Sequence, residues 1–196
     1  MEKLIVVKFG GSAIGINGEG LPTILKRIRH LKEDSKVIVV CSAPLTTIND
    51  QKISLTDVIL SLGKDPVNPD ISMEIVYQTY SKILEMVNDD FKEECNKKIN
   101  DMLILASKAL EDAKALGRFE DEIRAKALAY SGEVLMSHVL NYVLKSNGIK
   151  SEPVSLDDWP IITDNNIEST NFVFTQSNEH TEKLEELVKQ NDVVSI

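Results

Sequence analysis

Apolar residues follow two kinds of pattern along the chain. Near the start, a continuous apolar run at 4–7 is followed by a glycine pair, by apolar residues spaced three and four apart over 21–32, and by a second run at 37–40. Short continuous runs are typical of strands buried on both faces of a parallel sheet, and the wider spacing is typical of an amphipathic helix. The opening residues therefore predict a right-handed βαβ unit.

The middle of the chain, about 71–147, keeps helical spacing over most of its length. Three long helices are predicted in it, over 71–87, 91–116 and 120–146. Gly148 is expected to end the third helix, as a glycine after a helix often does. A loop containing two prolines is predicted just before this region, over 63–70. We interpret 71–147 as a helical insert in the sheet.

After Gly148 the strand pattern returns. Short strands are predicted at 153–156, 161–163, 172–174 and 193–196, with an acidic amphipathic helix over 179–189. The whole pattern predicts the α/β class, specifically an α/β/α sandwich with a mainly parallel sheet interrupted by the insert. We expect residues 1–196 to form one domain.

Charge and cysteine content exclude several classes of function. Acidic residues number 31 against 22 Lys and Arg, a net charge of −9, which disfavours nucleic-acid binding driven by bulk charge. No apolar run approaches the roughly 20 residues of a membrane helix, and the start lacks the length of a signal peptide. We therefore expect a cytoplasmic protein without a membrane partner, in which Cys41 is a buried free thiol. No Cys/His cluster has metal-ligand spacing, so no protein metal site is expected.

Candidate chemistry begins at the end of the first predicted strand, with Lys8, Gly10, Gly11 and Ser12. Glycine permits positive φ and a close approach of an anion, and consecutive N–H groups in such a turn form an anion-binding nest. The Ser12 hydroxyl and the Lys8 ammonium would add donors, which favours a phosphate site. The order of residues matches neither of the known phosphate-binding motifs GxGxxG and GxxxxGKS. The alternative is therefore an ordinary tight turn beside an exposed Lys8.

Four segments in order along the chain resemble the aspartate kinases of the amino acid kinase family. They are Val-Val-Lys-Phe-Gly-Gly-Ser at 6–12, Val-Val-Cys-Ser-Ala at 39–43, Tyr-Ser-Gly-Glu-Val-Leu at 130–135, and 147–164, which opens with Asn-Gly-Ile and closes with Ile-Thr-Asp. The resemblance spans essentially the whole chain and includes the helical insert between the second and third segments.

The resemblance implies ATP-dependent phosphorylation of the β-carboxylate of L-aspartate, the first step toward lysine, threonine and methionine. It makes Lys8 the catalytic residue that neutralises phosphate charge during transfer. It also implies that Lys8 and the turn at 10–12 bind ATP, with magnesium accompanying the nucleotide. Ser42 and Glu133 match substrate-binding positions, and Glu133 is expected to pair with the amino group of aspartate.

One departure from the family concerns a threonine that binds substrate. In the register of the family's Thr-Asn or Thr-Asp pair, this chain has Ile48 and Asn49. Thr47 lies one residue earlier, and a loop shorter by one residue would restore its role, so Thr47 is a candidate substrate-binding residue. Alternatively, Thr46 and Thr47 are ordinary loop residues.

A second departure concerns length. The family's Thr-Leu-Gly-Arg-Gly-Gly-Ser-Asp segment is absent, as are the nucleotide-binding half and the ACT domains. We therefore expect an N-terminal, substrate-binding half that is inactive alone and belongs to a homodimer. The alternatives are a stand-alone module that binds an amino acid or anion, a kinase for another acid such as acetylglutamate or glutamate, and acidic helices that serve oligomerisation.

Overall fold

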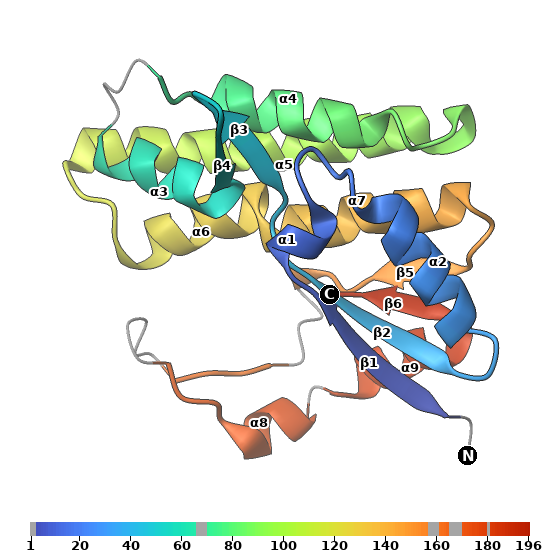
Figure 1. Ribbon diagram of the computed structural model, residues 1–196. Coiled ribbons are helices and arrows are strands. Elements are labelled where there is room, and N and C mark those ends of the chain that lie inside the picture. The colour runs from blue at the N-terminus through green and yellow to red at the C-terminus, as the bar shows by residue number, and fades with distance from the viewer. Residues whose placement is uncertain (1–2, 66–69, 157–160, 165–169, 180) are drawn as a thin grey trace.

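The main sheet of the protein has four parallel strands. The structure is a computed structural model that describes residues 3–65, 70–156, 161–164, 170–179 and 181–196. The strand order is β1 (Leu4–Phe9), β2 (Lys36–Cys41), β6 (Val193–Ser195) and β5 (Ser151–Pro153), and each neighbouring pair is parallel (Figure 1). The predicted α/β class with a mainly parallel sheet is therefore confirmed.

Helices cover both faces of this sheet. They are α2 (Leu21–Leu31) and α7 (Glu133–Ser146) on one face and α9 (Thr181–Gln190) on the other (Figure 1). Val39 of β2 joins the main core with α2 and α7, whereas its neighbour Ile38 packs with Leu184 of α9. Because successive side chains of a strand point to opposite faces, β2 is buried on both sides, and the three layers form the expected sandwich.

The first strand is partly buried on one face and exposed on the other, so the prediction of burial on both faces was wrong. Val7 and Phe9 pack against the main core, but Leu4 and Val6 are 50% and 64% exposed. β1 lies at the edge of the sheet, and the contacts of α9 fall on β2 and β6 instead. An apolar run shows that a segment is a strand, but the neighbouring elements decide how many of its faces are covered.

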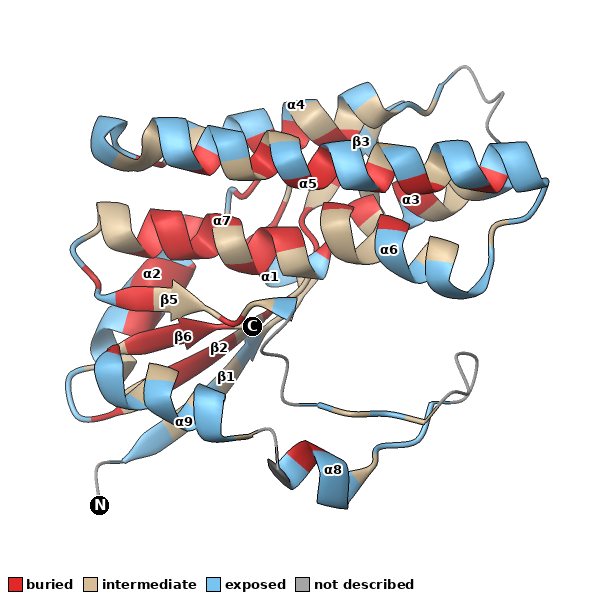
Figure 2. Ribbon diagram, turned by 180° about the vertical axis from the view of Figure 1, so that it is seen from behind, coloured by how far each residue is buried: buried red, intermediate tan, exposed pale blue. Residues whose placement is uncertain are grey.

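The helical insert packs on the outer side of α7, away from the sheet (Figure 1). It consists of α3 (Leu55–Lys64), α4 (Met73–Leu84), α5 (Asp89–Leu116) and α6 (Asp121–Ser131). Figure 2 shows buried residues on the sides of α4 and α5 that face the rest of the insert. Among the described residues, no helix is long and apolar enough to cross a membrane.

The insert differs from the predicted range 71–147 at both ends. At its end, α7 packs against the sheet and belongs to the sandwich, and at its beginning α3 is added. α3 starts before residue 71 and continues into the predicted loop over 63–70, of which 66–69 lie outside the described residues. Its start has a clear local cause, because the Ser54 hydroxyl accepts a 3.0 Å hydrogen bond from the Asp57 N–H. That is an ordinary N-cap, so the signal was present in the sequence.

A hairpin between β2 and α3 was also missed. β3 (Leu45–Ile48) and β4 (Gln51–Ser54) pair antiparallel, and the two residues between them, Asn49 and Asp50, have φ values of 49° and 61°. Two successive positive φ values are typical of the type I′ turn of tight hairpins, which Asn and Asp tolerate better than most residues.

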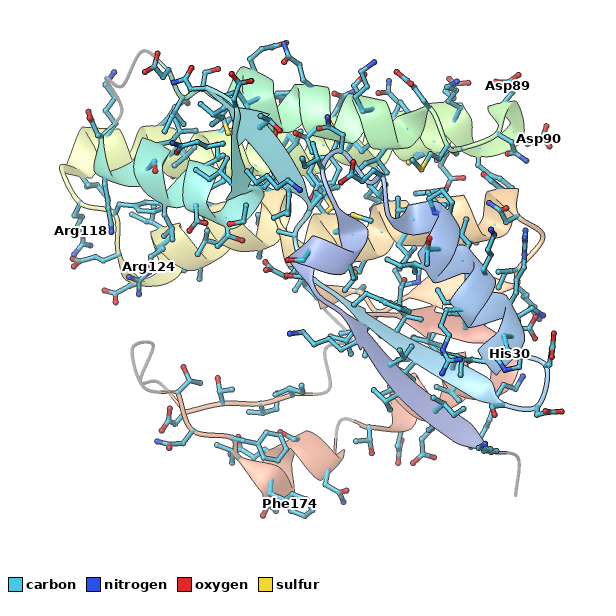
Figure 3. The ribbon with its side chains drawn as sticks, in the orientation of Figure 1. His30, Asp89, Asp90, Arg118, Arg124 and Phe174 are labelled. Carbon is cyan, nitrogen blue, oxygen red and sulfur yellow. The ribbon has the colours of Figure 1, made fainter. Side chains whose placement is uncertain are left out.

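The C-terminal part is less regular than predicted. β6 matches the strand expected at 193–196, and Ser151–Pro153 replaces the one expected at 153–156. The strands expected at 161–163 and 172–174 reduce to one bridge between Thr163 and Phe172. A short helix, α8 (Phe174–Glu179), begins where the second of them was expected to end, and Phe174 stands exposed on it (Figure 3).

Candidate functional site

The candidate residues of the N-terminal part meet where β1 and β2 end. In the parallel register Phe9 pairs with Cys41, so the loops that follow the two strands leave the same edge of the sheet. The Ser42 N–H donates a 3.1 Å hydrogen bond to the Phe9 carbonyl oxygen. The carboxyl ends of neighbouring strands are where open α/β sheets bind ligands, so this edge is the candidate site.

The glycine turn uses close approach and not positive φ. Gly10 is extended (φ −75°) and caps α1 (Gly11–Ile14), and neither Gly10 nor Gly11 has a positive φ. A Cβ at Gly11 would lie 3.0 Å from the Ala43 carbonyl oxygen and 3.4 Å from Leu45 Cδ2. Gly11 is therefore needed where the two loops touch. A Cβ at Gly10 would meet nothing within 4 Å, so Gly10 borders open space.

Several donors face solvent around this turn. The first N–H groups of a helix have no partner within the helix, which in α1 concerns Gly11 and Ser12. The Ser12 side chain is exposed, and so is Lys8, two residues before Gly10 on β1. The turn therefore has the donors that a phosphate group needs. Within the described ranges, no three His, Cys, Asp or Glu side chains gather as a metal-binding group.

Glu133 begins a helix, because the single helix predicted over 120–146 is divided at Gly132 into α6 and α7. A Cβ at Gly132 would lie only 2.7 Å from the Leu128 carbonyl oxygen and 3.6 Å from the Ala43 Cβ. The glycine thus allows the chain to break between two helices and to touch the end of β2. An exposed carboxylate in the first turn of α7 is favoured by the helix dipole.

The division at Gly132 also brings Glu133 to the sheet edge. Burial, and then the charge of Glu133, raises the pKa of the Cys41 thiol to about 12. The start of α7 therefore lies beside the loop that follows β2. Segments far apart in the sequence, at Gly11, at Ser42 and Ala43, and at Gly132, meet at this end of the sheet.

Tyr80, on α4 of the insert, was not predicted as a residue of this region. Its side chain is completely buried, and its hydroxyl lies 3.0 Å from the carbonyl oxygens of both Ser131 and Gly132. In the sequence, Tyr80 is one apolar position of a helical pattern, and nothing local distinguishes it from an ordinary core residue.

Thr47 lies farther from the glycine turn. It is exposed on β3, and Thr46 beside it is buried, so both belong to a strand and the alternative of loop residues was wrong. Thr47 shares a face of β3 with Leu45, the residue that contacts Gly11, and is about 7 Å farther along the strand. The role of Thr47 in binding substrate stays a prediction.

The charged residues at the ends of the insert lie away from this edge. Figure 3 shows Asp89 and Asp90 at one end of α5, and Arg118 and Arg124 near its other end. The two aspartates occupy the first turn of α5, where negative charge stabilises a helix. Their position fits a structural role in the helix better than a role in a ligand site.

Comparison with known proteins agrees with this fold. The profile of the amino acid kinase family matches residues 3–196. No curated protein matches the sequence. Among solved structures, E. coli aspartokinase III in complex with aspartate and ADP (R-state) is 14% identical with a TM-score of 0.77, over 99% of this chain and 40% of that chain. E. coli aspartokinase III in complex with lysine and aspartate (T-state) is also 14% identical, with a TM-score of 0.75 over 100% of this chain and 40% of that one.

These numbers establish the family and the fold. At 14% identity, the two aspartokinase structures show only that the fold is shared. The chain spans less than half of the length of either aspartokinase chain. The family profile, in contrast, matches nearly every residue of this sequence. The chain therefore belongs to the amino acid kinase family.

Proposed function

We propose that the chain is the amino-acid-binding part of an aspartate kinase, which transfers the γ-phosphoryl group of ATP to the β-carboxylate of L-aspartate. What supports this proposal most is that the glycine turn, the loop with Ser42 and Ala43, and Gly132 just before Glu133 lie together at one edge of the sheet. Membership of the amino acid kinase family supports a kinase. The fold shared with aspartokinase III, which was solved with aspartate, supports this choice of substrate.

Each group has a distinct part in the proposed reaction. Phosphoryl transfer depends on positioning and on stabilisation of charge, more than on covalent chemistry from the protein. The Lys8 ammonium and the N–H groups of Gly11 and Ser12 would hold phosphate oxygens, with Gly10 leaving room for them. Magnesium would be held mainly by phosphates and water, since the described residues contain no metal-binding group of their own.

The amino acid would be held on the other side of the same edge. A carboxylate is a natural partner for the ammonium group of aspartate, and Glu133 is exposed at the start of α7. The Ser42 hydroxyl would donate a hydrogen bond to a carboxylate of the substrate, and the Thr47 hydroxyl would donate a second one from the hairpin. A homodimer also remains part of the proposal, and a sizing column would test it.

Calorimetric titration of the chain with L-aspartate tests the function, with L-glutamate and succinate as comparison ligands. Succinate has both carboxylates of aspartate but lacks the amino group. We expect aspartate to bind more tightly than either. Glu133→Gln should weaken aspartate binding by about tenfold or more, because a charge-assisted hydrogen bond is worth roughly 1.5–3 kcal/mol.

Glu182→Gln is the matched control. Glu182 is also an exposed glutamate in the first turn of a helix, α9, so the two variants make the same change of charge in the same helical position. Its binding of aspartate should equal that of the unchanged chain. Tighter binding of glutamate would favour a kinase for another acid, and an equal effect of the two variants would remove Glu133 from the site.

A further inference from the structure

Tyr80 joins the helical insert to the segment that carries Glu133. The tyrosine lies on α4, and its hydroxyl is 3.0 Å from the carbonyl oxygen of Ser131 and 3.0 Å from that of Gly132. Its side chain has no exposed surface. One buried hydroxyl is thus shared by the two carbonyl groups that separate α6 from α7.

The Ser131 carbonyl group needs a donor from outside its own helix. The last carbonyl groups of a helix have no partner within that helix, and a buried polar group without a partner destabilises the fold. Ser131 ends α6 and is itself buried. The Gly132 carbonyl also accepts a 2.9 Å bond from the Met136 N–H in the first turn of α7. The tyrosine hydroxyl therefore contacts both the end of one helix and the beginning of the next.

We propose that Tyr80 is a positioning residue of the amino-acid site, which holds the turn at Ser131 and Gly132 so that Glu133 meets the ammonium group of the substrate. This inference rests on the proposed function, because it assigns Glu133 to that group. Tyr80 itself contacts the turn and not the ligand. The helical insert then contributes directly to the geometry of the site.

The surroundings of the tyrosine fit this role. Burial, followed by electrostatic interactions with Cys41 and Glu133, raises the pKa of the Tyr80 phenol well above its ordinary value. The hydroxyl consequently keeps its proton and remains a donor at every pH at which the protein would be studied. The two hydrogen bonds place the phenol at the turn just before α7.

The rest of α4 keeps the tyrosine in place. Val76 and Ile83, on either side of Tyr80 along the helix, are also completely buried in the main core. Because the helical turns before and after Tyr80 are fixed in the core, its side chain loses little further freedom when it binds the turn at Ser131 and Gly132. Removal of the hydroxyl alone is therefore the appropriate test, because the ring and its packing stay unchanged.

The experiment compares Tyr80→Phe with Tyr142→Phe by titration with L-aspartate and succinate. Tyr142 is the matched control, since its hydroxyl also makes a hydrogen bond, 3.1 Å to Glu94 Oε1, but on a part of α7 distant from Glu133. We expect Tyr80→Phe to lower the preference for aspartate over succinate by about three- to tenfold. Tyr142→Phe should leave this preference unchanged.

The ligand preference, the aspartate binding of the unchanged chain and the amide exchange rate each test a different part of the proposal. An unchanged preference in Tyr80→Phe, or an equal loss of affinity for both ligands, would overturn the positioning role, because neither involves the amino group. If the unchanged chain binds no aspartate, the proposed function itself fails. Amide hydrogen exchange over 132–136 then decides whether Tyr80 holds the turn: faster exchange in Tyr80→Phe than in Tyr142→Phe supports it, and equal exchange overturns it.

Discussion

The carbonyl oxygen of Leu128 accepts a 2.8 Å hydrogen bond from the Gly132 N–H and would lie only 2.7 Å from a Cβ at the same glycine. The backbone of Gly132, with φ −114° and ψ −117°, departs from the helical conformation, and a side chain there would press against this oxygen. This departure from helical backbone ends α6 and sets where α7, and with it Glu133, begins.

We expect Gly132→Ala to lower the free energy of unfolding by about 1–3 kcal/mol, the usual effect of forcing an extra methyl group into a packed site. It should also weaken aspartate binding, because Glu133 follows directly. Urea unfolding and titration measure the two effects. Gly10→Ala is the control for stability, since its Cβ would meet nothing within 4 Å. Equal stability of the two variants would contradict the clash.

Lys8→Ala tests the proposed catalytic lysine. In the active enzyme, the turnover rate, measured as ADP formed, should fall by about 10²–10³-fold. That is the typical loss when one preorganised charge-stabilising group is removed. The affinity for aspartate should stay the same, because the lysine is assigned to phosphate. Lys26→Ala, at an exposed lysine of α2, is the control and should leave turnover unchanged. Near-normal turnover of Lys8→Ala would remove the lysine from catalysis.

From the surroundings of His138 on α7, we predict that the free energy of unfolding falls in mild acid. Burial, followed by the charge of Lys98, lowers the pKa of its imidazole from 6.5 to about 4, although Glu152 opposes the shift. The unfolded chain therefore takes up this proton near pH 6.5 and the folded chain only near pH 4. Stability should fall as the pH drops between these values, by about 1–3 kcal/mol at most.

The comparison for this prediction is His138→Gln against His30→Gln. The first variant lacks the titrating group and should lose less stability between pH 6.5 and 4 than the unchanged chain. His30 projects from the outer side of α2 into solvent, so His30→Gln is the comparison at an exposed histidine (Figure 3). Identical pH profiles of unfolding for both variants would show that His138 has no such effect.

Both cysteines should be unreactive while the protein is folded. Cys41 and Cys95 are free and buried, and burial is the main reason that the pKa of each thiol rises to about 12. Since the thiolate is the reactive form, a disulfide reagent at pH 8 should label the native chain far more slowly than the urea-unfolded chain. Rapid labelling of the native protein would mean that one of these sites opens readily.

Much of the fold was predictable because its signals are local. The apolar spacing over 91–116 located α5 nearly to its ends, and Gly148, with a φ of 70°, follows the end of α7 as expected. Resemblance in four short segments identified Lys8, Ser42 and Glu133. The fold brings the segments of these residues to one sheet edge, while their roles remain to be measured.

Other features had no local signal of sufficient strength. Periodicity ran unbroken through Gly132, because a helix interior and a helix boundary have the same apolar spacing. Tyr80 looked like a core residue, and the glycine pair gave no sign of the loop that Gly11 touches. For Tyr80 and Gly11 the decisive contact is with a backbone atom from another segment, the carbonyl oxygens of Ser131 and Ala43, and for Gly132 it is the Leu128 carbonyl oxygen four residues earlier.

By itself, the sequence determined which segments of this protein form its longer helices and its central strands, because hydrophobic periodicity is a property of neighbouring residues. Only the tertiary structure decided that β1 lies at an edge with Val6 exposed, that the helix stops before Glu133, and that the Tyr80 hydroxyl meets the turn. The physical reason is that burial, close approach and hydrogen bonding between distant segments depend on which surfaces pack together.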